Sequence, residues 1–359
     1  MNKFWIFILL VTSSICSKGQ VGGKSTYQFL NIVTSPKIAA LGGIAIAIED
    51  ADLEMTYFNP ALLSSKHSKT IVLNYTDYFA DINYGFVGYA HRYKKIGTLA
   101  GGIKYIHYGD FIHANEVGDI LGDFSVSETA AFLTWSNKYK DKIKYGANIK
   151  LVYSDFFLYN SLGILLDFGA TYKKPKSNFM AALIMRNVGV QITTYTPGNR
   201  ESLPFEIQLG ISQKFKHAPF RFSMNAHNLQ QPNIWFKSPN RTTVSTINVS
   251  DSVEAETGTP LGEAILRHLT FGVELLLSPN IELRMGYNYQ RRQELTLQEG
   301  SKSGFVGFSF GFGVKIKKFS FDYARSIYSL AGATNHIGIS TNFGEILKKS
   351  KSKNKEIIK

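Results

Sequence analysis

The side chains that could bind a cation lie together in one acidic stretch near the N-terminus. Glu49, Asp50, Asp52 and Glu54 fall within six consecutive positions. Their carboxylate oxygens could hold a metal ion. The same pattern is typical of the solvated start of a helix, where acidic residues are favoured by the helix dipole. We favour the helix start, so the sequence predicts no bound metal and no cofactor.

A second charged group combines Arg221, Glu282 and Arg284. These residues alternate with apolar ones in two predicted strands, so we expect their side chains on the polar face of a sheet. The group could be a selectivity patch in a channel. It could also be a polar network that holds another part of the chain in place, because buried charges must be paired. We favour the network.

Patterns typical of enzymes are missing from the sequence. It contains no nucleophile elbow, phosphate-binding loop or zinc signature. Cys16 is the only cysteine, and it lies in a segment with the features of a secretory signal peptide, residues 1–19. The mature chain is therefore expected to lack disulfides, thiolate nucleophiles and cysteine ligands. We predict a protein that is not an enzyme.

The stretch 305–316 (FVGFSFGFGVKI) shows most clearly the alternation of side chains that predicts the fold. Alternate positions carry large apolar side chains from Val306 to Ile316, and the positions between them are small, including Gly307, Gly311 and Gly313. Strict alternation over this length predicts an extended strand with one apolar face. The small face predicts close packing inside a closed structure, where these glycines would line the lumen.

Fourteen extended segments follow one another, and the alternation recurs in them except in 178–189, which is apolar on both faces. Most are near the roughly 9–11 residues that a tilted strand needs to cross a bilayer. The predicted strands are 68–78, 82–92, 96–108, 124–136, 143–156, 159–172, 178–189, 205–214, 220–229, 267–277, 281–291, 304–316, 319–328 and 336–343.

The connections between these segments predict an outer-membrane barrel. Every second connection is a short turn, and most of the others are long, which is the pattern of periplasmic turns and extracellular loops. A soluble β-sandwich would explain the alternation but not the one-sided loops, the even strand number and the signal peptide together. The fold class is therefore all-β: a transmembrane antiparallel barrel of fourteen strands over residues 68–343.

Residues 20–67 are expected to plug the lumen as an N-terminal hatch. Gly42 and Gly43 permit a tight bend, and Asn59 and Pro60 mark a turn or the start of an element. The stretch 39–48 is small and apolar enough to pack inside the barrel. With an even number of strands, we place this plug and the C-terminus on the periplasmic side.

The net charge of +13 comes from lysines in short turns and in a tail, residues 344–359. Scattered lysines on an exported chain argue against nucleic acid as a partner. A rim near anionic headgroups of outer-membrane lipids, or solvated turns, explain them equally well. The mean hydropathy of −0.08 excludes a bundle of membrane-spanning helices. Trp235 and Phe236, in the long loop 230–266, are a candidate partner-binding pair.

Longer motifs resemble known families. ALGGIAIAIEDADLEMTYFNPALL resembles the hatch of FadL-like outer-membrane barrels. GGKSTYQFLN, LPFEIQLGISQKFKHAPFRFSMNAHNLQ, MGYNYQRRQEL and SLAGATNHIGISTNF resemble the PorQ family of the type IX secretion system. This resemblance implies a barrel that anchors a PorZ-like surface protein, together with a PorU-like sortase and a PorV-like barrel. Such a complex processes secreted cargo and attaches it to lipopolysaccharide. The alternative is a FadL-like transporter of hydrophobic small molecules.

Overall fold

The computed structural model describes residues 25–50, 52–79, 81–94, 96–140, 142–175, 177–232, 234, 261–294, 304–329 and 332–344. The predicted signal peptide and nearly all of the predicted lysine-rich tail lie outside these residues. In this part of the chain, no helix is long and apolar enough to cross a membrane.

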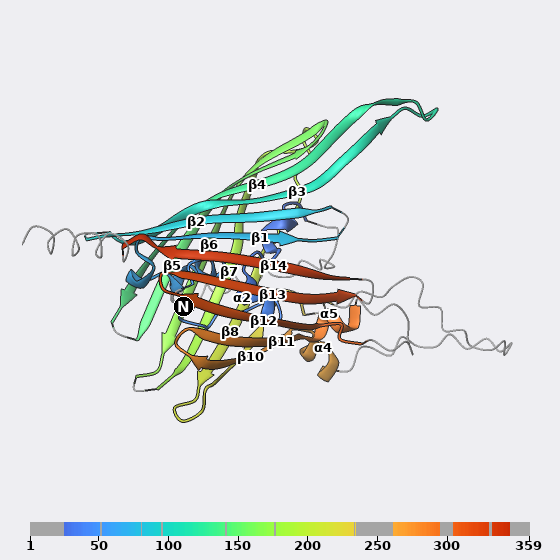
Figure 1. The fold of residues 1–359 in the computed structure, drawn as a ribbon. Helices are drawn as coiled ribbons and strands as arrows, with labels where there is room; N and C mark the ends of the chain where they lie inside the picture. Colours follow the sequence, from blue (N-terminus) through green and yellow to red (C-terminus); the bar gives the residue numbers. More distant parts are fainter. Residues whose placement is uncertain are drawn as a thin grey trace, which may run out of the picture.

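The strands form one closed antiparallel barrel in which each pairs with its neighbours in sequence and β1 pairs with β14 (Figure 1). The prediction of a fourteen-stranded antiparallel barrel is confirmed. The strands are β1 (Thr70–Asp77), β2 (Asn83–Tyr93), β3 (Gly97–Ala114), β4 (Ile120–Tyr139), β5 (Ile143–Phe156), β6 (Tyr159–Lys173), β7 (Phe179–Thr193), β8 (Glu206–Lys214), β9 (Phe220–Ala226), β10 (Leu269–Ser278), β11 (Ile281–Asn288), β12 (Phe308–Ile316), β13 (Phe319–Ser329) and β14 (Gly332–Asn342).

The barrel wall follows the alternation of the sequence. In β2, Tyr84 and Phe86 are buried inside, whereas Val87 and Tyr89 are exposed outside. Apolar side chains exposed on the outside recur around the strands, as expected for a wall that faces lipid. Short turns lie at one end of the barrel and the long β3–β4 hairpin lies at the other (Figure 1). We refer to these as the short-turn end and the outer end.

Two predicted strand boundaries are wrong for a local reason. β12 begins at Phe308, because Gly307 before it has a φ of +86° and breaks the extended conformation. Gly307 therefore lies in the preceding turn and not in the lumen, and Val306 is buried there instead of facing lipid. β11 ends at Asn288, where the chain turns into the short helix α5 (Tyr289–Glu294). A further helix, α4 (Leu261–Arg267), precedes β10.

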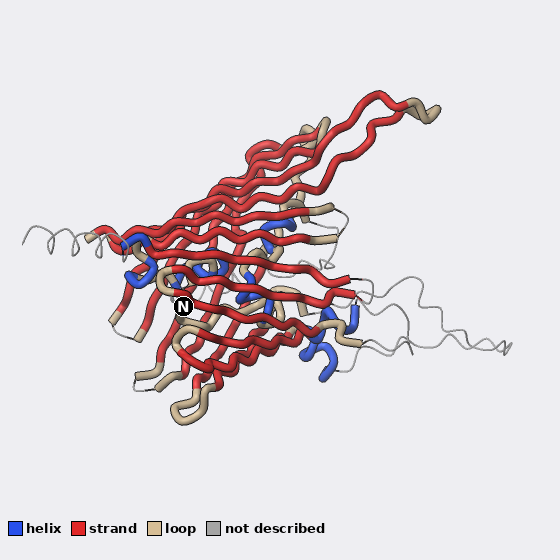
Figure 2. The backbone as a smooth tube through the Cα atoms, in the orientation of Figure 1, coloured by secondary structure: helices blue, strands red, loops and turns tan. Residues whose placement is uncertain are grey.

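The N-terminal segment lies inside the barrel (Figure 2). We call residues 25–67 the hatch segment. It contains η1 (Gln28–Asn31), α2 (Pro36–Ala40), α3 (Met55–Phe58), η2 (Pro60–Leu62) and η3 (Ser65–His67). α2 contacts β11 to β14, and η2 contacts β4 to β6 on another part of the wall.

The hatch segment runs from the outer end toward the short-turn end. Ser25 forms a bridge with Ser202 in the long β7–β8 connection. Near its other end, the carbonyl of Leu63 accepts a hydrogen bond of 2.6 Å from Ser136, close to the β4–β5 turn. The expectation that the whole plug lies on the side of the C-terminus is therefore wrong at its beginning. The hatch segment crosses the lumen before β1 starts.

The core of the protein lies between the hatch segment and the inner wall. Its largest apolar cluster joins α2 and α3 to inward-facing residues of the strands. Tyr57 occupies its centre and packs edge-to-face against Phe58, Phe86 and Phe132. A second cluster forms around Tyr27, Phe29 and Leu30 nearer the outer end. Burying the hatch segment therefore supplies the apolar core that the lumen would otherwise lack.

Candidate functional site

The bend at Gly42 and Gly43 is a close contact between the hatch segment and the barrel wall. Both residues have positive φ, +91° and +94°. Asn288 of β11 donates a hydrogen bond of 3.2 Å to the carbonyl of Gly42. Opposite it, a Cβ on Gly286 would collide with the hatch backbone. The two backbones can therefore touch only because neither residue has a side chain.

Two lumen glycines of β12 make room for different neighbours. A Cβ on Gly311 would lie 2.7 Å from Cβ of Ala40 in α2. A Cβ on Gly313 would instead meet the charged side chains of Arg284 and Asp322. Gly311 thus accommodates the hatch segment, and Gly313 accommodates an ion pair of the wall.

Asn59 and Pro60 form the start of η2, as their types suggest. The Asn59 side chain is fully buried, accepts a hydrogen bond of 3.0 Å from the amide of Ala61, and donates one of 2.7 Å to the carbonyl of Ile46. The first bond caps the short helix. The second ties two parts of the hatch segment to each other, so Asn59 fixes the segment's own fold.

The charged centre of the site is Lys37, at the start of α2. Its ammonium is 2.5 Å from Asp50 and 2.7 Å from Asp52, both in the hatch segment. It is also 3.5 Å from Glu282 of β11 and 3.6 Å from Glu274 of β10. The lysine side chain is only 1% exposed. A single buried cation therefore joins the hatch segment to the wall.

Two arginines of the wall complete this charge network. Arg221 of β9 binds both oxygens of Asp50, at 2.9 and 2.6 Å, and also binds Glu274. Arg284 of β11 pairs with Asp322 of β13 at 2.7 Å and with Glu282. The structure thus places the sequence-predicted residues Asp50, Arg221, Glu282 and Arg284 in one network.

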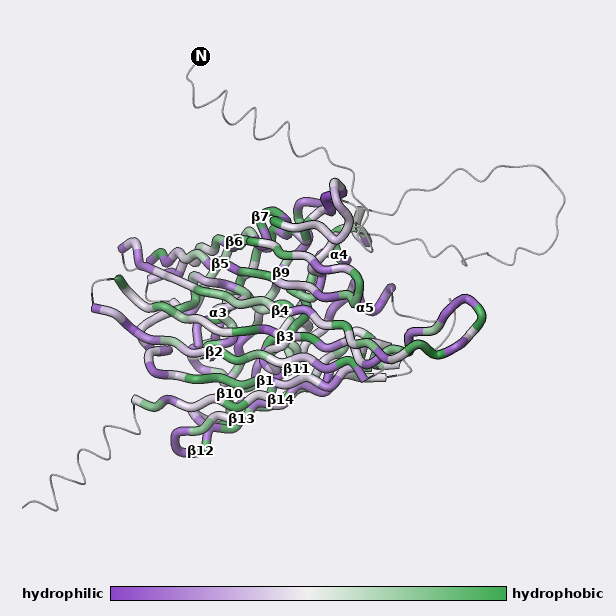
Figure 3. The backbone as a smooth tube through the Cα atoms, turned by 90° about the horizontal axis from the view of Figure 1, so that it is seen from above, coloured by the Kyte–Doolittle hydropathy of each residue, from purple (hydrophilic) through white to green (hydrophobic). Residues whose placement is uncertain are grey.

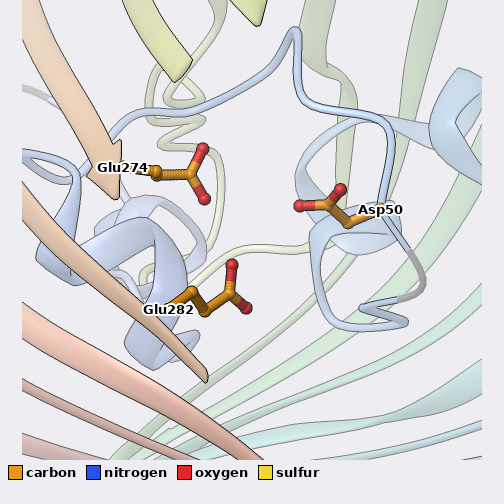
Figure 4. A group of neighbouring side chains, drawn as sticks. All are labelled: Asp50, Glu274 and Glu282. Atoms are coloured by element: carbon orange, nitrogen blue, oxygen red, sulfur yellow. The ribbon is translucent and has the colours of Figure 1, made fainter. Parts of the chain in front are cut away.

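Figure 4 shows Asp50, Glu274 and Glu282 with their carboxylates directed toward one another. Their oxygens lie within 4.8 Å of each other, close enough for a metal ion. The ammonium of Lys37 lies among them and supplies the positive charge. The acidic stretch is therefore not the solvated helix start that the sequence favoured. Its cation is a lysine of the same chain.

The hatch carboxyls respond to this environment in opposite directions. Burial alone would raise the pKa of Asp50, but Lys37 and Arg221 hold that pKa far below its usual value. For Lys37, burial opposes the charge, yet Asp50 and Asp52 raise its pKa well above the ordinary value. For Glu54, burial together with Asp52 raises the pKa to about 8, because the opposing charge of Lys37 is the weaker influence.

A separate ion pair lies at the short-turn end. Glu49 pairs with Lys144 of β5 and, at 2.7 Å, with Lys173 of β6. Burial would raise the pKa of Glu49, but hydrogen bonds and charge from the two lysines lower it to about 2. The hatch segment is thus bound electrostatically to the β5–β6 wall as well as to β9–β11.

The cations of the middle lumen hold the hatch backbone and rings. Lys104 donates hydrogen bonds to the carbonyls of Leu30 and Ile32, at 3.2 and 2.5 Å. Arg186 donates to the carbonyl of Leu30 at 3.1 Å and stacks over the ring of Phe58. Sequence reasoning missed these residues and Lys37. Each is a charged residue at an inward-facing strand position or in an otherwise apolar stretch, and that pattern could have identified it.

A pocket opens at the outer end, beside the start of the hatch segment. Its volume is about 480 Å³, and Tyr27, Tyr108, Phe156, Tyr159 and Tyr195 contribute aromatic rings to its lining. Its polar lining includes Glu128, which accepts a hydrogen bond of 2.5 Å from Tyr108. The pocket is therefore aromatic and acidic. The predicted partner-binding pair, Trp235 and Phe236, lies outside the described residues.

No protein-family model and no curated protein matches this chain. Among solved structures, the toluene transporter TbuX of Ralstonia pickettii has a TM-score of 0.51 at 12% identity, over 87% of this chain and 99% of that one. The shared fold is a closed barrel like that of TbuX. The identity is too low to show more than the fold.

Two further structures have the same architecture at lower similarity. The toluene transporter TodX of Pseudomonas putida has a TM-score of 0.48 at 11% identity, covering 90% of this chain and 98% of that one. A FadL homologue of Pseudomonas aeruginosa has a TM-score of 0.47 at 10% identity, covering 90% and 100%. Similarity at this level shows the fold alone, so the function must be inferred from the residues of this chain.

Proposed function

We propose that this chain is a non-enzymatic outer-membrane barrel that anchors a PorZ-like surface protein. It would act in the type IX secretion attachment complex with a PorU-like sortase and a PorV-like barrel, where secreted cargo is processed and attached to lipopolysaccharide. The family resemblance of the sequence motifs names these partners. The main observation behind the proposal is that ion pairs hold the hatch segment to two sides of the lumen wall.

The strength of this fixation argues for a closed barrel. Lys37 and Asp50 bind the β9–β11 wall, and Glu49 binds the β5–β6 wall. Removing one partner from the fully buried Lys37–Glu274 pair costs about 3–5 kcal/mol, and the partly exposed Glu49 pairs contribute less. Opening the lumen would require several such pairs to separate at once. An anchor needs no opening, whereas a channel must provide one.

A transporter of hydrophobic molecules is the second candidate. The aromatic pocket at the outer end and the FadL-like fold support it. TbuX, described as a toluene transporter, shares that fold, although fold alone is weak support for a shared substrate. Gly101 and Gly102 are adjacent in β3, where two such residues could allow a kink or a lateral opening. Both residues remain paired with β2 and β4, so the wall is continuous at that point.

Affinity purification from native outer membranes tests the proposal directly. A tagged barrel in mild detergent should retain a large cell-surface protein in near-equal amounts. Toluene uptake by cells that carry or lack the barrel tests the transporter. Retention of a surface protein without altered uptake supports the anchor. Altered toluene uptake with no retained surface protein would overturn the anchor in favour of the transporter.

A further inference from the structure

The β3–β4 hairpin extends well past the barrel wall (Figures 1 and 3). The last pair that β3 forms with β2 is His107 with Asn83, and the last pair that β4 forms with β5 is Val126 with Phe156. Beyond these pairs, residues 108–125 form strand pairs only with each other. We call residues 108–125 the hairpin tip. Both of its strand edges are therefore open.

The length of the hairpin places its tip outside the membrane. β3 has 18 residues and β4 has 20, against 11 for β2. Since a tilted strand crosses the hydrocarbon layer in about 9–11 residues, the tip is not needed to span it. The tip belongs to the end of the barrel with the long connections, which is the extracellular end in outer-membrane barrels.

The tip exposes large apolar side chains. Ile112, Val117, Ile120 and Leu121 are each at least 60% exposed, and Val117 reaches 86%. A two-stranded ribbon has no core in which to bury them. A cluster of exposed apolar residues of this kind on an extracellular element marks an interaction surface.

The tip is also strongly acidic. It carries Asp110, Glu116, Asp119 and Asp123, and no lysine or arginine occurs between Lys104 and Lys138. This concentration of negative charge stands out in a chain whose net charge is +13. Glu116 directly precedes Val117, and Asp119 directly precedes Ile120, so a partner that contacts the apolar side chains also meets carboxylates.

The base of the tip is stiffened by aromatic stacking. The rings of Phe111 and Phe124 stack across the hairpin at 5.4 Å. Phe124 also stacks at 4.5 Å on Phe157 in the β5–β6 turn. An interaction surface that is already ordered loses less conformational entropy when it binds.

We propose that the hairpin tip is the docking site for a cell-surface protein whose contact face is apolar and framed by lysine and arginine. This inference rests on the proposed anchoring function and names its surface. Charge complementarity selects this occupant. Anionic headgroups and a second acidic tip would both be repelled by the carboxylates. The open strand edges additionally allow the partner to add a strand.

Photo-crosslinking on intact cells identifies the occupant. A Val117→Cys variant carries a benzophenone maleimide at the tip, and an Asn199→Cys variant carries it on the exposed β7–β8 connection as the matched control. One discrete protein adduct from the tip alone supports the proposal. Adducts with lipid only, or with a second copy of the barrel, would overturn it.

The charge requirement is tested with the protein captured in this way. The variant D110N/E116Q/D119N/D123N should bind it about tenfold or more weakly at low ionic strength, and the difference should shrink in high salt. The variant D77N/D81N, which removes one acid at the end of β1 and one in the β1–β2 turn, should bind normally. Unboiled gel mobility checks that each barrel is folded. Equal affinity of the first variant and the wild type would refute the role of charge.

The two proposals can fail separately. If the intact barrel retains no surface protein from native membranes, the anchoring function fails. If it retains one that still binds at full strength after residues 111–124 are replaced by Asn-Gly, only the docking site fails. That replacement joins Asp110 to Ser125, which already face each other across the hairpin.

Discussion

Replacing Lys37 by methionine tests the charge network at its centre. The change keeps a long apolar stem but removes the ammonium that lies within 3.6 Å of four carboxylates. Those carboxylates then repel one another in a largely buried site. Removing one partner of a buried ion pair costs about 3–5 kcal/mol, which corresponds to a hundredfold to several-thousandfold shift in an equilibrium. The cost falls on hatch docking, because the wall is closed by its own strand pairs.

Hydrogen exchange of the peptide that covers α2 measures this shift. The amide of Ala39, bonded to the carbonyl of Ser35 at 2.9 Å, should lose protection by that factor while β5 and β6 keep theirs. Adding Asp52→Asn should restore part of the protection, since it removes one of the stranded charges. Acid should also reduce the defect, because protonation neutralises the freed carboxylates. If Lys37→Met exchanges like the wild type, or if Asp52→Asn makes it worse, the electrostatic account is refuted.

The remaining predictions address the contacts of the hatch segment with the wall. Leu41→Cys with Gly272→Cys should form a disulfide that links the hatch segment to β10. The two Cβ atoms would lie 3.2 Å apart, near the roughly 3.5–4.5 Å found in disulfides. Mass spectrometry of the oxidised protein checks this prediction. Gly286→Ala should raise hydrogen exchange in the hatch, since its Cβ would collide with the hatch backbone, whereas Gly262→Ala, in open space, should leave exchange unchanged. Glu49→Gln should weaken hatch docking at pH 7 by about 2 kcal/mol, allowing for partial solvation. Because the folded pKa of Glu49 is lowered to about 2, that difference should be full above pH 4.5 and vanish as the pH falls toward 2, as measured by hatch exchange across this range.

The architecture of the barrel could be predicted because it depends on local patterns. Alternation of side chains fixes which face of each strand meets lipid, and the turn lengths fix which end is which. β5, predicted over 143–156, has those bounds in the structure. The error at β12 has a local cause that the alternation hides, since Gly307 fits the small face but adopts a positive φ.

The interior could be predicted only in part because its contacts join distant residues. Nothing near Lys37 in sequence indicates Glu274 or Glu282, more than two hundred positions away. Arg221 and Glu282 were identifiable because charged residues at inward-facing strand positions need partners. Which charge pairs with which depends on the path of the hatch segment. Sequence reasoning placed that path wrongly at its outer end.

The hairpin tip escaped prediction for a related reason. The alternation predicts strands that end at residue 108 and begin again at 124, near the length that a bilayer requires. In the structure, β3 continues to Ala114 and β4 begins at Ile120. Excess length beyond a membrane crossing is not needed to close a barrel, so it must be explained by what lies outside the membrane.

The hatch and the hairpin tip impose different requirements on the same barrel. The hatch segment is bound by buried and partly buried ion pairs to the β9–β11 and β5–β6 walls. The tip carries apolar and acidic side chains that the described part of the barrel does not cover. A transporter must spend binding energy on moving its plug, and each buried pair in the lumen makes that movement more costly. An anchor benefits from the same pairs, because a rigid lumen holds the base of the hairpin in a fixed orientation toward its partner. The buried charge network and the exposed tip are therefore both consistent with the proposed attachment function.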